Sequence, residues 1–285
     1  MVYNEIKQEA PKNPSNLLFA GTGMNNLVFH LNAKHKVMVQ IGRMGIKRTL
    51  HTAAAVGNYV FVMGGNESTE IERYNKNTSA SQKINLALDN VTPYLTSGVI
   101  NNKIYTFGGM INEKPTKRVR CFDPEHMSYA KQPRMLKANY YNSCVRIEDI
   151  FYITSGKYCL NIQRFDPREG LWSLLDEIPN GTYSQAVTSF DDDIMCIGGF
   201  DKDFVNSDKC YTYDVKACQW YEMQDFPEPV SGGIACEIEK KVLVLGIRNK
   251  YYSNNAYEYK KRTGKWKQVE MDLPKQMGFM SKCAM

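Results

Sequence analysis

The stretch Ile104-Tyr105-Thr106-Phe107-Gly108-Gly109 decides the fold, because it recurs in altered form along the chain. In each copy a short apolar run ends in two small residues, as in Tyr59 to Gly65 and Ile194 to Gly199. Neighbouring copies are about 43 to 48 residues apart, and periods of roughly 20 to 50 residues are typical of repeat architectures. The weaker copies end in Gly21-Thr22-Gly23, Ser155-Gly156 and Gly246-Ile247.

A second marker follows each glycine-ended run and keeps the same register. An aromatic residue is followed seven positions later by a second bulky residue, and all three tryptophans occupy that second position. Two copies depart from this pattern, because Tyr74 is followed by Ser81 and Phe29 by Lys36. The intact pairs are Phe122/Tyr129, Phe165/Trp172, Tyr213/Trp220 and Tyr259/Trp266.

Each copy also contains an apolar stretch before the glycine-ended run. The two stretches are joined by residues typical of tight hairpin turns, such as Gly57-Asn58 and Asn101-Asn102. Each unit therefore reads as four short strands. The glycines end the second strand, where a sharp turn favours a residue without a Cβ atom. The aromatic residue falls on the third strand and the Trp-like residue on the fourth.

This order of strand, turn, glycine-ended strand, aromatic residue and tryptophan resembles the kelch repeat. The resemblance implies an all-β, six-bladed β-propeller of four-stranded antiparallel blades over residues 17–285. The polar residues 1–16 read as a linker that precedes it. The first unit lacks its first strand, and an unused strand-like segment follows Leu273-Pro274. We therefore expect this C-terminal segment to join the first blade beside Leu17 to Ala20, which would close the ring and remove exposed sheet edges.

Composition narrows the class of protein. The net charge is +6, and no run of Lys and Arg reaches five residues, so a nucleic-acid or membrane partner is not expected. No stretch approaches 18 consecutive apolar residues. The eight cysteines contain no CxxC pair and read as reduced thiols. The expected location is the cytoplasm, with the cytoskeleton and the nucleus as alternatives.

The sequence offers no recognisable catalytic or metal site, so we expect neither enzymatic activity nor a cofactor. The four histidines, His30, His35, His51 and His126, have no metal-binding spacing. Asp191 to Asp193 occupies a predicted turn and reads as a solvated hairpin. An enzyme of the galactose-oxidase type, which shares the repeat, would need copper ligands from His and Tyr around the ring axis.

The topology of an antiparallel four-stranded blade predicts the binding face. The loop after the second strand and the connection into the next blade should lie at the same end of the ring, and loops on a rigid scaffold commonly carry function. These loops are rich in Tyr and Arg, which dominate recognition hot spots. Arg48 is the first candidate, because it precedes Gly64 by sixteen residues, where peptide-binding kelch proteins commonly place an arginine. The predicted partner-binding residues are Arg43, Arg48, Tyr94, Tyr140, Tyr141, Tyr158, Tyr183, Phe204, Arg248, Tyr251 and Phe279.

The resemblance implies a protein-interaction module similar to the C-terminal part of BTB-BACK-kelch proteins. In those proteins the propeller captures a target, and separate domains bind a cullin ubiquitin-ligase scaffold. The implied role is substrate recognition for ubiquitination, with a protein partner that carries an acidic motif and with cullin reached only through domains absent from this chain. The alternative is a cytoskeletal, actin-associated or scaffolding kelch protein.

Overall fold

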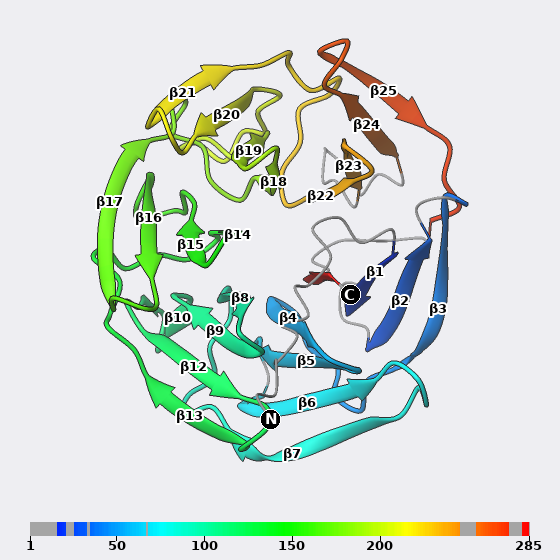
Figure 1. Cartoon of the computed structure of the whole chain (residues 1–285), viewed down its shortest axis with the longest axis vertical. Coiled ribbons are helices and arrows are strands. Elements are labelled where there is room, and N and C mark those ends of the chain that lie inside the picture. The colour runs from blue at the N-terminus through cyan, green and yellow to red at the C-terminus, as the bar shows by residue number, and fades with distance from the viewer. Residues whose placement is uncertain are drawn as a thin grey trace, which may run out of the picture.

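The computed structural model describes residues 16–20, 26–32, 35–66, 68–245, 255–273 and 281–284. The regular elements of this part of the chain are β-strands, which form four-stranded antiparallel sheets and one separate two-stranded hairpin. The sheets are arranged as blades around a central axis, with the first strand of each blade innermost and the fourth at the rim (Figure 1).

Five blades are each built from one continuous stretch of chain. The first two are formed by β4 (His51–Val56), β5 (Tyr59–Gly64), β6 (Glu70–Asn75) and β7 (Ser81–Ala87), and by β8 (Thr96–Ile100), β9 (Lys103–Phe107), β12 (Val119–Asp123) and β13 (Ser128–Lys131). An unpredicted hairpin of β10 (Met110–Ile111) and β11 (Lys114–Pro115) interrupts the second of these blades after β9.

The other three continuous blades follow without such an insertion. Their strands are β14 (Cys144–Ile147), β15 (Ile150–Ile153), β16 (Asn161–Asp166) and β17 (Leu171–Glu177); β18 (Ala186–Phe190), β19 (Asp193–Ile197), β20 (Cys210–Asp214) and β21 (Gln219–Glu222); and β22 (Ile234–Ile238), β23 (Lys241–Leu245), β24 (Ala256–Lys260) and β25 (Lys265–Val269).

The remaining four-stranded sheet is a composite of both ends of the described chain. It contains β1 (Asn16–Ala20), β2 (Leu27–Asn32), β3 (Val37–Arg43) and β26 (Ser281–Ala284), in the order β26-β1-β2-β3. The predicted pairing of the C-terminal strand beside Leu17 to Ala20 is confirmed by the antiparallel register Leu17↔Ala284 to Ala20↔Ser281. The predicted count of six blades is corrected: the ring contains five blades, each formed by one continuous repeat. The composite sheet from the two ends of the described chain fills the gap between the last and the first of these blades (Figure 1).

Hairpin turns at the predicted positions connect the first and second strands. Asn101 and Asn102 both have positive φ, at 50° and 58°, and Asp191 and Asp192 have 51° and 67°. Two consecutive residues with positive φ match the right-handed twist of the strands, and Asn and Asp tolerate this conformation better than most residues. The acidic run at Asp191 is therefore a hairpin turn, as its sequence predicted.

The two aromatic markers of the sequence form cross-strand pairs between the third and fourth strands. Phe165 pairs with Trp172 and Tyr259 with Trp266, and the ring centroids lie 4.6 and 5.1 Å apart. The indole of Trp172 also donates to the carbonyl of Pro133 at 3.0 Å, in the segment that follows the preceding blade. Trp172 thus both packs against the third strand of its blade and bonds to the segment that follows the preceding blade.

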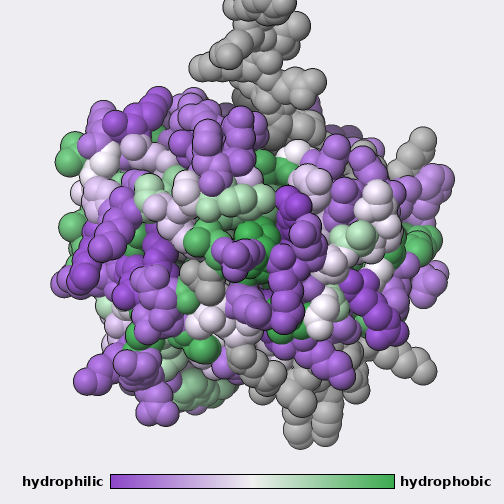
Figure 2. Space-filling model, turned by 90° about the horizontal axis from the view of Figure 1, so that it is seen from below, coloured by the Kyte–Doolittle hydropathy of each residue, from purple (hydrophilic) through white to green (hydrophobic). Residues whose placement is uncertain are grey.

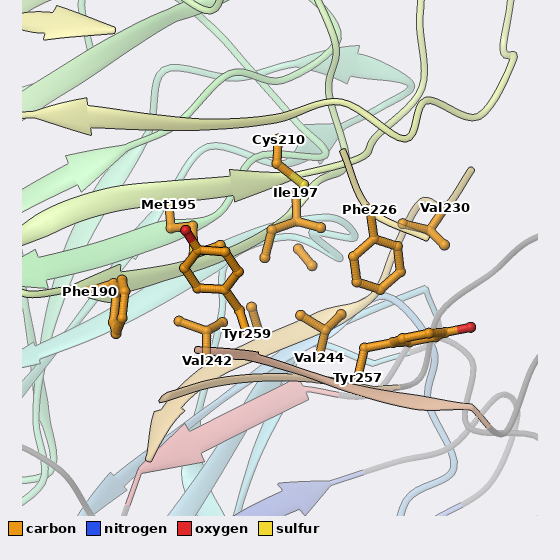
Figure 3. Packing of buried hydrophobic residues seen from close by; sticks show 12 residues of the cluster. Phe190, Met195, Ile197, Cys210, Phe226, Val230, Val242, Val244, Tyr257 and Tyr259 are labelled. Carbon is orange, nitrogen blue, oxygen red and sulfur yellow. The ribbon is translucent and has the colours of Figure 1, made fainter. Parts of the chain in front are cut away.

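Hydrophobic clusters lie between adjacent sheets and form the core. Figure 3 shows one of them, in which Met195 and Ile197 of β19 face Val242 and Val244 of β23. All four of these side chains are fully buried, and burying an aliphatic side chain stabilises a fold by about 1.5–3 kcal/mol. The outer edge of the disc seen in Figure 2 is largely hydrophilic, with hydrophobic residues scattered through it.

Candidate functional site

The loops after the second strands lie against the connections that enter the next blade. The amide of Gly65 donates to the carbonyl of Thr92 at 3.1 Å, and the amide of Gly199 donates to that of Val230 at 2.8 Å. The predicted juxtaposition of these two sets of loops is therefore present. We call their common surface the loop face; it comprises residues 43–50, 65–66, 89–95, 109–118, 137–141, 156–158, 181–184, 199–206 and 229–232.

The glycine pairs permit this close approach between blades. Gly108 has a φ of 64°, and a Cβ atom there would lie 2.5 Å from the carbonyl oxygen of Asn139 in the next connection. Glycine is therefore required at this position for two reasons: it adopts the left-handed backbone conformation, and it has no side chain to clash with the next connection. Where the sequence has Ser155 instead of glycine, its hydroxyl donates to the carbonyl of Thr182 at 2.9 Å, so the serine joins the blades by a different bond.

Each connection between continuous blades contains one residue with positive φ just before the first strand. The φ values are 61° at Tyr94, 59° at Tyr141, 59° at Ser184 and 61° at Gly232. Backbone hydrogen bonds link some of these positions, because the amide of Ser184 donates to Tyr141 at 3.1 Å and that of Gly232 to Ser184 at 2.8 Å. Equivalent points of successive blades therefore form a row across the loop face, and tyrosine occupies two of them.

Three tyrosines from two neighbouring connections form a compact group, which we call the tyrosine cluster: Tyr94, Tyr140 and Tyr141. Their ring centroids lie 4.3 to 5.4 Å apart at tilted angles. Tilted contacts at these distances are favourable for aromatic pairs. Tyr158 continues the group at 5.6 Å from Tyr140, and Tyr183 lies 6.1 Å from Tyr141.

The tyrosine cluster forms part of the wall of a pocket of about 560 Å³ on the loop face. The pocket extends over three successive blades, since Phe204 belongs to the blade that begins at β18 and Met110 to the β10–β11 hairpin. Its volume lies in the usual range of ligand pockets, roughly 300–1,000 Å³. The lining residues are Asn90, Val91, Pro93, Tyr94, Met110, Asn112, Glu113, Tyr140, Tyr141, Lys157 and Phe204.

A buried asparagine positions the second connection of the tyrosine cluster. The side-chain carbonyl of Asn139 accepts from the amides of Tyr140 and Tyr158, each at 3.1 Å, and its NH₂ group donates to the carbonyl of Cys159 at 2.9 Å. Asn139 is fully buried. Because three hydrogen bonds depend on one side chain, the backbones that carry Tyr140 and Tyr158 are held together.

Phe204 is presented by a tight loop after β19. The carboxylate of Asp201 accepts from the amides of Asp203 at 2.8 Å and Val205 at 2.9 Å, and Phe204 between them has a φ of 60°. The ring of Phe204 is 57% exposed, and the ammonium of Lys157 lies 4.1 Å from its centroid. This geometry is that of a cation–π contact.

The hydroxyls of Tyr140 and Tyr141 remain protonated at neutral pH. Burial raises the pKa of Tyr141, and a hydrogen bond with Tyr94 adds to the increase. Burial also raises the pKa of Tyr140, with the nearby hydroxyls of Tyr158 and Tyr94 as smaller causes. Both groups therefore act as neutral hydroxyls.

The structure corrects the role predicted for Arg48. Its side chain is only 2% exposed, and its guanidinium donates to the carbonyls of Gly64 at 3.1 Å and Glu70 at 3.0 Å. It also lies 3.8 Å from the carboxylate of Glu72, whose side chain is 1% exposed. Burial lowers the pKa of Arg48, while the charges of Glu72 and Glu70 raise it. Arg48 therefore holds its connection onto β5 and β6 and offers almost no surface to a partner.

The other predicted residues fall into three groups. Tyr94, Tyr140, Tyr141 and Phe204 line the pocket, while Tyr158, 64% exposed, and Tyr183, buried, lie beside it. Arg43 is exposed at the end of β3 and is not part of the pocket wall. The last group lies outside the described residues: Arg248, Tyr251 and Phe279.

Sequence reasoning missed the pocket residues of the β10–β11 hairpin. Met110, Asn112 and Glu113 line the pocket, and the two tip residues Asn112 and Glu113 have φ values of 49° and 62°. The signal was present, because the insertion between Gly109 and Arg118 is longer than in most other units. A short hairpin in that loop would bring its base next to the tyrosine cluster.

The described residues contain no group of three or more His, Cys, Asp or Glu side chains placed to hold a metal ion. In the same part of the chain, no helix has the length and apolar character needed to cross a bilayer.

Comparison with known proteins agrees with the fold. The Kelch motif matches residues 92–135. The chain is 22% identical over 226 residues to Kelch-like protein 15 of Homo sapiens and 21% identical over 230 residues to Kelch-like protein 25 of Xenopus tropicalis. These alignments cover 68% and 75% of this chain but only 37% and 39% of the relatives. The chain thus spans well under half the length of these relatives.

A solved structure, that of YjhT, matches the fold with a TM-score of 0.77 at 14% identity, covering 92% of this chain and 99% of the other. The four-stranded blades, the glycine-ended strands and these similarities define the chain as a kelch-repeat β-propeller. Among proteins that contain this repeat, it resembles the kelch-like proteins.

Proposed function

We propose that the chain is a protein-interaction module whose loop face binds a segment of another protein at the tyrosine cluster. The observation that carries the proposal is the pocket itself, in which Tyr94, Tyr140, Tyr141 and Phe204 from three successive blades line one concave surface. Aromatic anchors next to pockets are the usual centres of binding energy in protein interfaces. The similarity to kelch-like proteins supports an interaction role for the propeller.

Exposed apolar side chains next to the pocket support the same proposal. Tyr158 is 64% exposed, Phe204 57%, Val205 58% and Val91 40%, and all four lie on the loop face. Large apolar residues gathered on one surface, unlike single scattered ones, mark interaction sites.

The finer proposal is that the propeller recognises substrates for a cullin-RING ubiquitin ligase. In this role the partner would be ubiquitinated, and cullin would be bound by other domains of a longer protein. Affinity purification of the longest natural form should recover a cullin; a preparation that recovers propeller partners but no cullin would remove this role. A cytoskeletal role is the alternative, and co-sedimentation with F-actin would support it.

The interaction role is tested by proximity labelling of cells that express wild-type protein, Tyr141→Gly or Tyr221→Ala. Tyr221 is a suitable control because it is 45% exposed on the outer strand β21, away from the pocket. We expect Tyr141→Gly to lose partners that wild type and Tyr221→Ala retain. Identical partner sets for all three proteins would show that the tyrosine cluster is not the binding site.

A further inference from the structure

Two residues of the tyrosine cluster hold a backbone conformation that does not suit them. Tyr94 and Tyr141 have φ values of 61° and 59°, whereas the same position of later connections carries Ser184 and Gly232. The left-handed conformation costs an L-residue roughly 1–2 kcal/mol relative to the right-handed one, and glycine avoids this cost. The preceding connection carries Leu50 at this point, with a φ of 57°. The fold therefore accepts small and aliphatic residues here, and it does not itself require the two aromatic rings.

These two rings are directed into the pocket together with groups that can donate hydrogen bonds. The hydroxyls of Tyr141 and Tyr94 are hydrogen-bonded to each other, so this pair keeps one hydroxyl proton for a ligand, and Lys157 supplies an ammonium. Asn90 accepts from Arg118 through its side-chain carbonyl at 3.0 Å, which leaves its NH₂ group as the remaining donor. The pocket thus combines aromatic surface with several hydrogen-bond donors.

The charge of the pocket is balanced. Among its lining residues, Lys157 and Glu113 are the two charged ones, and Lys157 lies over the ring of Phe204. Arg48, which was expected to attract an acidic partner, is buried against Glu72. An acidic segment would therefore meet one lysine and one opposing glutamate, without the bidentate arginine that recognises carboxylates best.

A neutral segment with apolar side chains and free carbonyl groups fits this chemistry better. The polyproline II helix has no internal hydrogen bonds, so all its carbonyls are available, and its proline rings pack against aromatic surfaces. An α-helical segment satisfies most of its carbonyls internally and would leave the donors of the pocket unused. We propose that the pocket of the tyrosine cluster binds a proline-rich segment of the partner in the polyproline II conformation.

This inference rests on the proposed interaction function and is tested with defined peptides. The purified chain is titrated with fluorescent twelve-residue peptides of three classes: neutral proline-rich, acidic and helix-forming, with a proline-to-alanine copy of each proline-rich peptide. We expect proline-rich peptides to bind best to wild type, and their alanine copies to bind at least about tenfold more weakly, which is the scale of a hot-spot contact. Tyr141→Gly should lose a similar factor, and Tyr221→Ala should bind as wild type does.

Each outcome has a distinct meaning. Equal binding of the proline-rich peptides and their alanine copies, or preference for the acidic or helical peptides, would overturn the inference without any use of variants. If proximity labelling finds partners that depend on Tyr141 but whose binding segments lack proline, the inference fails and the interaction function stands. If no partner depends on Tyr141, the proposed function fails as well.

Discussion

Replacing Arg48 by alanine should destabilise the propeller rather than act only on partner binding. The change removes two hydrogen bonds from a charged group to the carbonyls of Gly64 and Glu70. It also leaves the carboxylate of Glu72 buried without its counter-charge. Breaking a buried ion pair by removing one partner costs about 3–5 kcal/mol, because the remaining charge is uncompensated.

The geometry places the expected cost at the lower end of this range, about 3 kcal/mol. The guanidinium and carboxylate of the pair are 3.8 Å apart, which is longer than a good charge-assisted hydrogen bond. Glu72 also accepts hydrogen bonds from the amides of Gly45 and Ile46 and from the hydroxyl of Ser81, so the orphaned carboxylate keeps three donors. With an unfolding entropy of about 2.1 cal/mol/K per residue, a loss of this size lowers the Tm of the 285-residue chain by about 5 °C.

The measurement is thermal and urea unfolding of wild type, Arg48→Ala and Arg43→Ala. Arg43 is the matched control, because it is an exposed arginine at the end of β3; surface substitutions of this kind usually change stability by less than about 0.5 kcal/mol. Adding Glu72→Ala to Arg48→Ala should cost less than the sum of the single changes, since the orphaned charge is then removed. If Arg48→Ala unfolds like Arg43→Ala but loses its partner, the assignment of Arg48 to the fold is wrong.

Three further changes test other parts of the structure. Gly108→Ala should lower the free energy of unfolding by more than the roughly 1–2 kcal/mol of a left-handed L-residue, because its Cβ would press on the next blade. Gly57→Ala should cost only the backbone term, because Gly57 has a φ of 54° and a Cβ there would meet no atom within 4 Å. Equal losses in urea unfolding would contradict the packing argument. Hydrogen bonds from Arg168 lower the pKa of Asp166 from 3.8 to about 2. The ionised Asp166 therefore stabilises the fold above about pH 4, and this stabilisation is lost as the pH falls toward 2. The difference in unfolding free energy between wild type and Asp166→Asn should shrink over that interval, and a constant difference would exclude this linkage. Tyr183→Phe should leave the free energy of unfolding unchanged or raise it by up to about 1 kcal/mol, because this buried hydroxyl has no hydrogen-bond partner within the described residues; a clear loss in calorimetry would indicate a partner.

The strand pattern of the blades was predictable because its determinants are local. A turn such as Asn101-Asn102, a glycine pair such as Gly64-Gly65 and an aromatic pair such as Phe165/Trp172 each act within a few residues. These signals recur at a fixed period, so errors in one copy are corrected by the others. The common loop face also followed from the sequence, because antiparallel connectivity alone determines at which end each loop lies.

The roles of individual side chains depended on contacts that the sequence does not encode locally. Arg48 was selected by its offset from Gly64, but its burial depends on Glu72, which lies on strand β6 farther along the chain. The contribution of the β10–β11 hairpin to the pocket depends in the same way on how it lies beside Tyr94. Position in a repeat therefore predicts the element that carries a residue, whereas its exposure is decided by partners elsewhere in the chain.

The composite sheet has a consequence for synthesis of the protein. Because β26 pairs with β1, the ring cannot close until residues 281–284 have left the ribosome. Until then one edge of β1 is unpaired in the nascent chain, and unpaired strand edges promote aggregation. Premature stop codons just before Ser281 should therefore produce protein that forms every continuous blade and yet aggregates or is degraded, even though the tyrosine cluster lies in its intact portion.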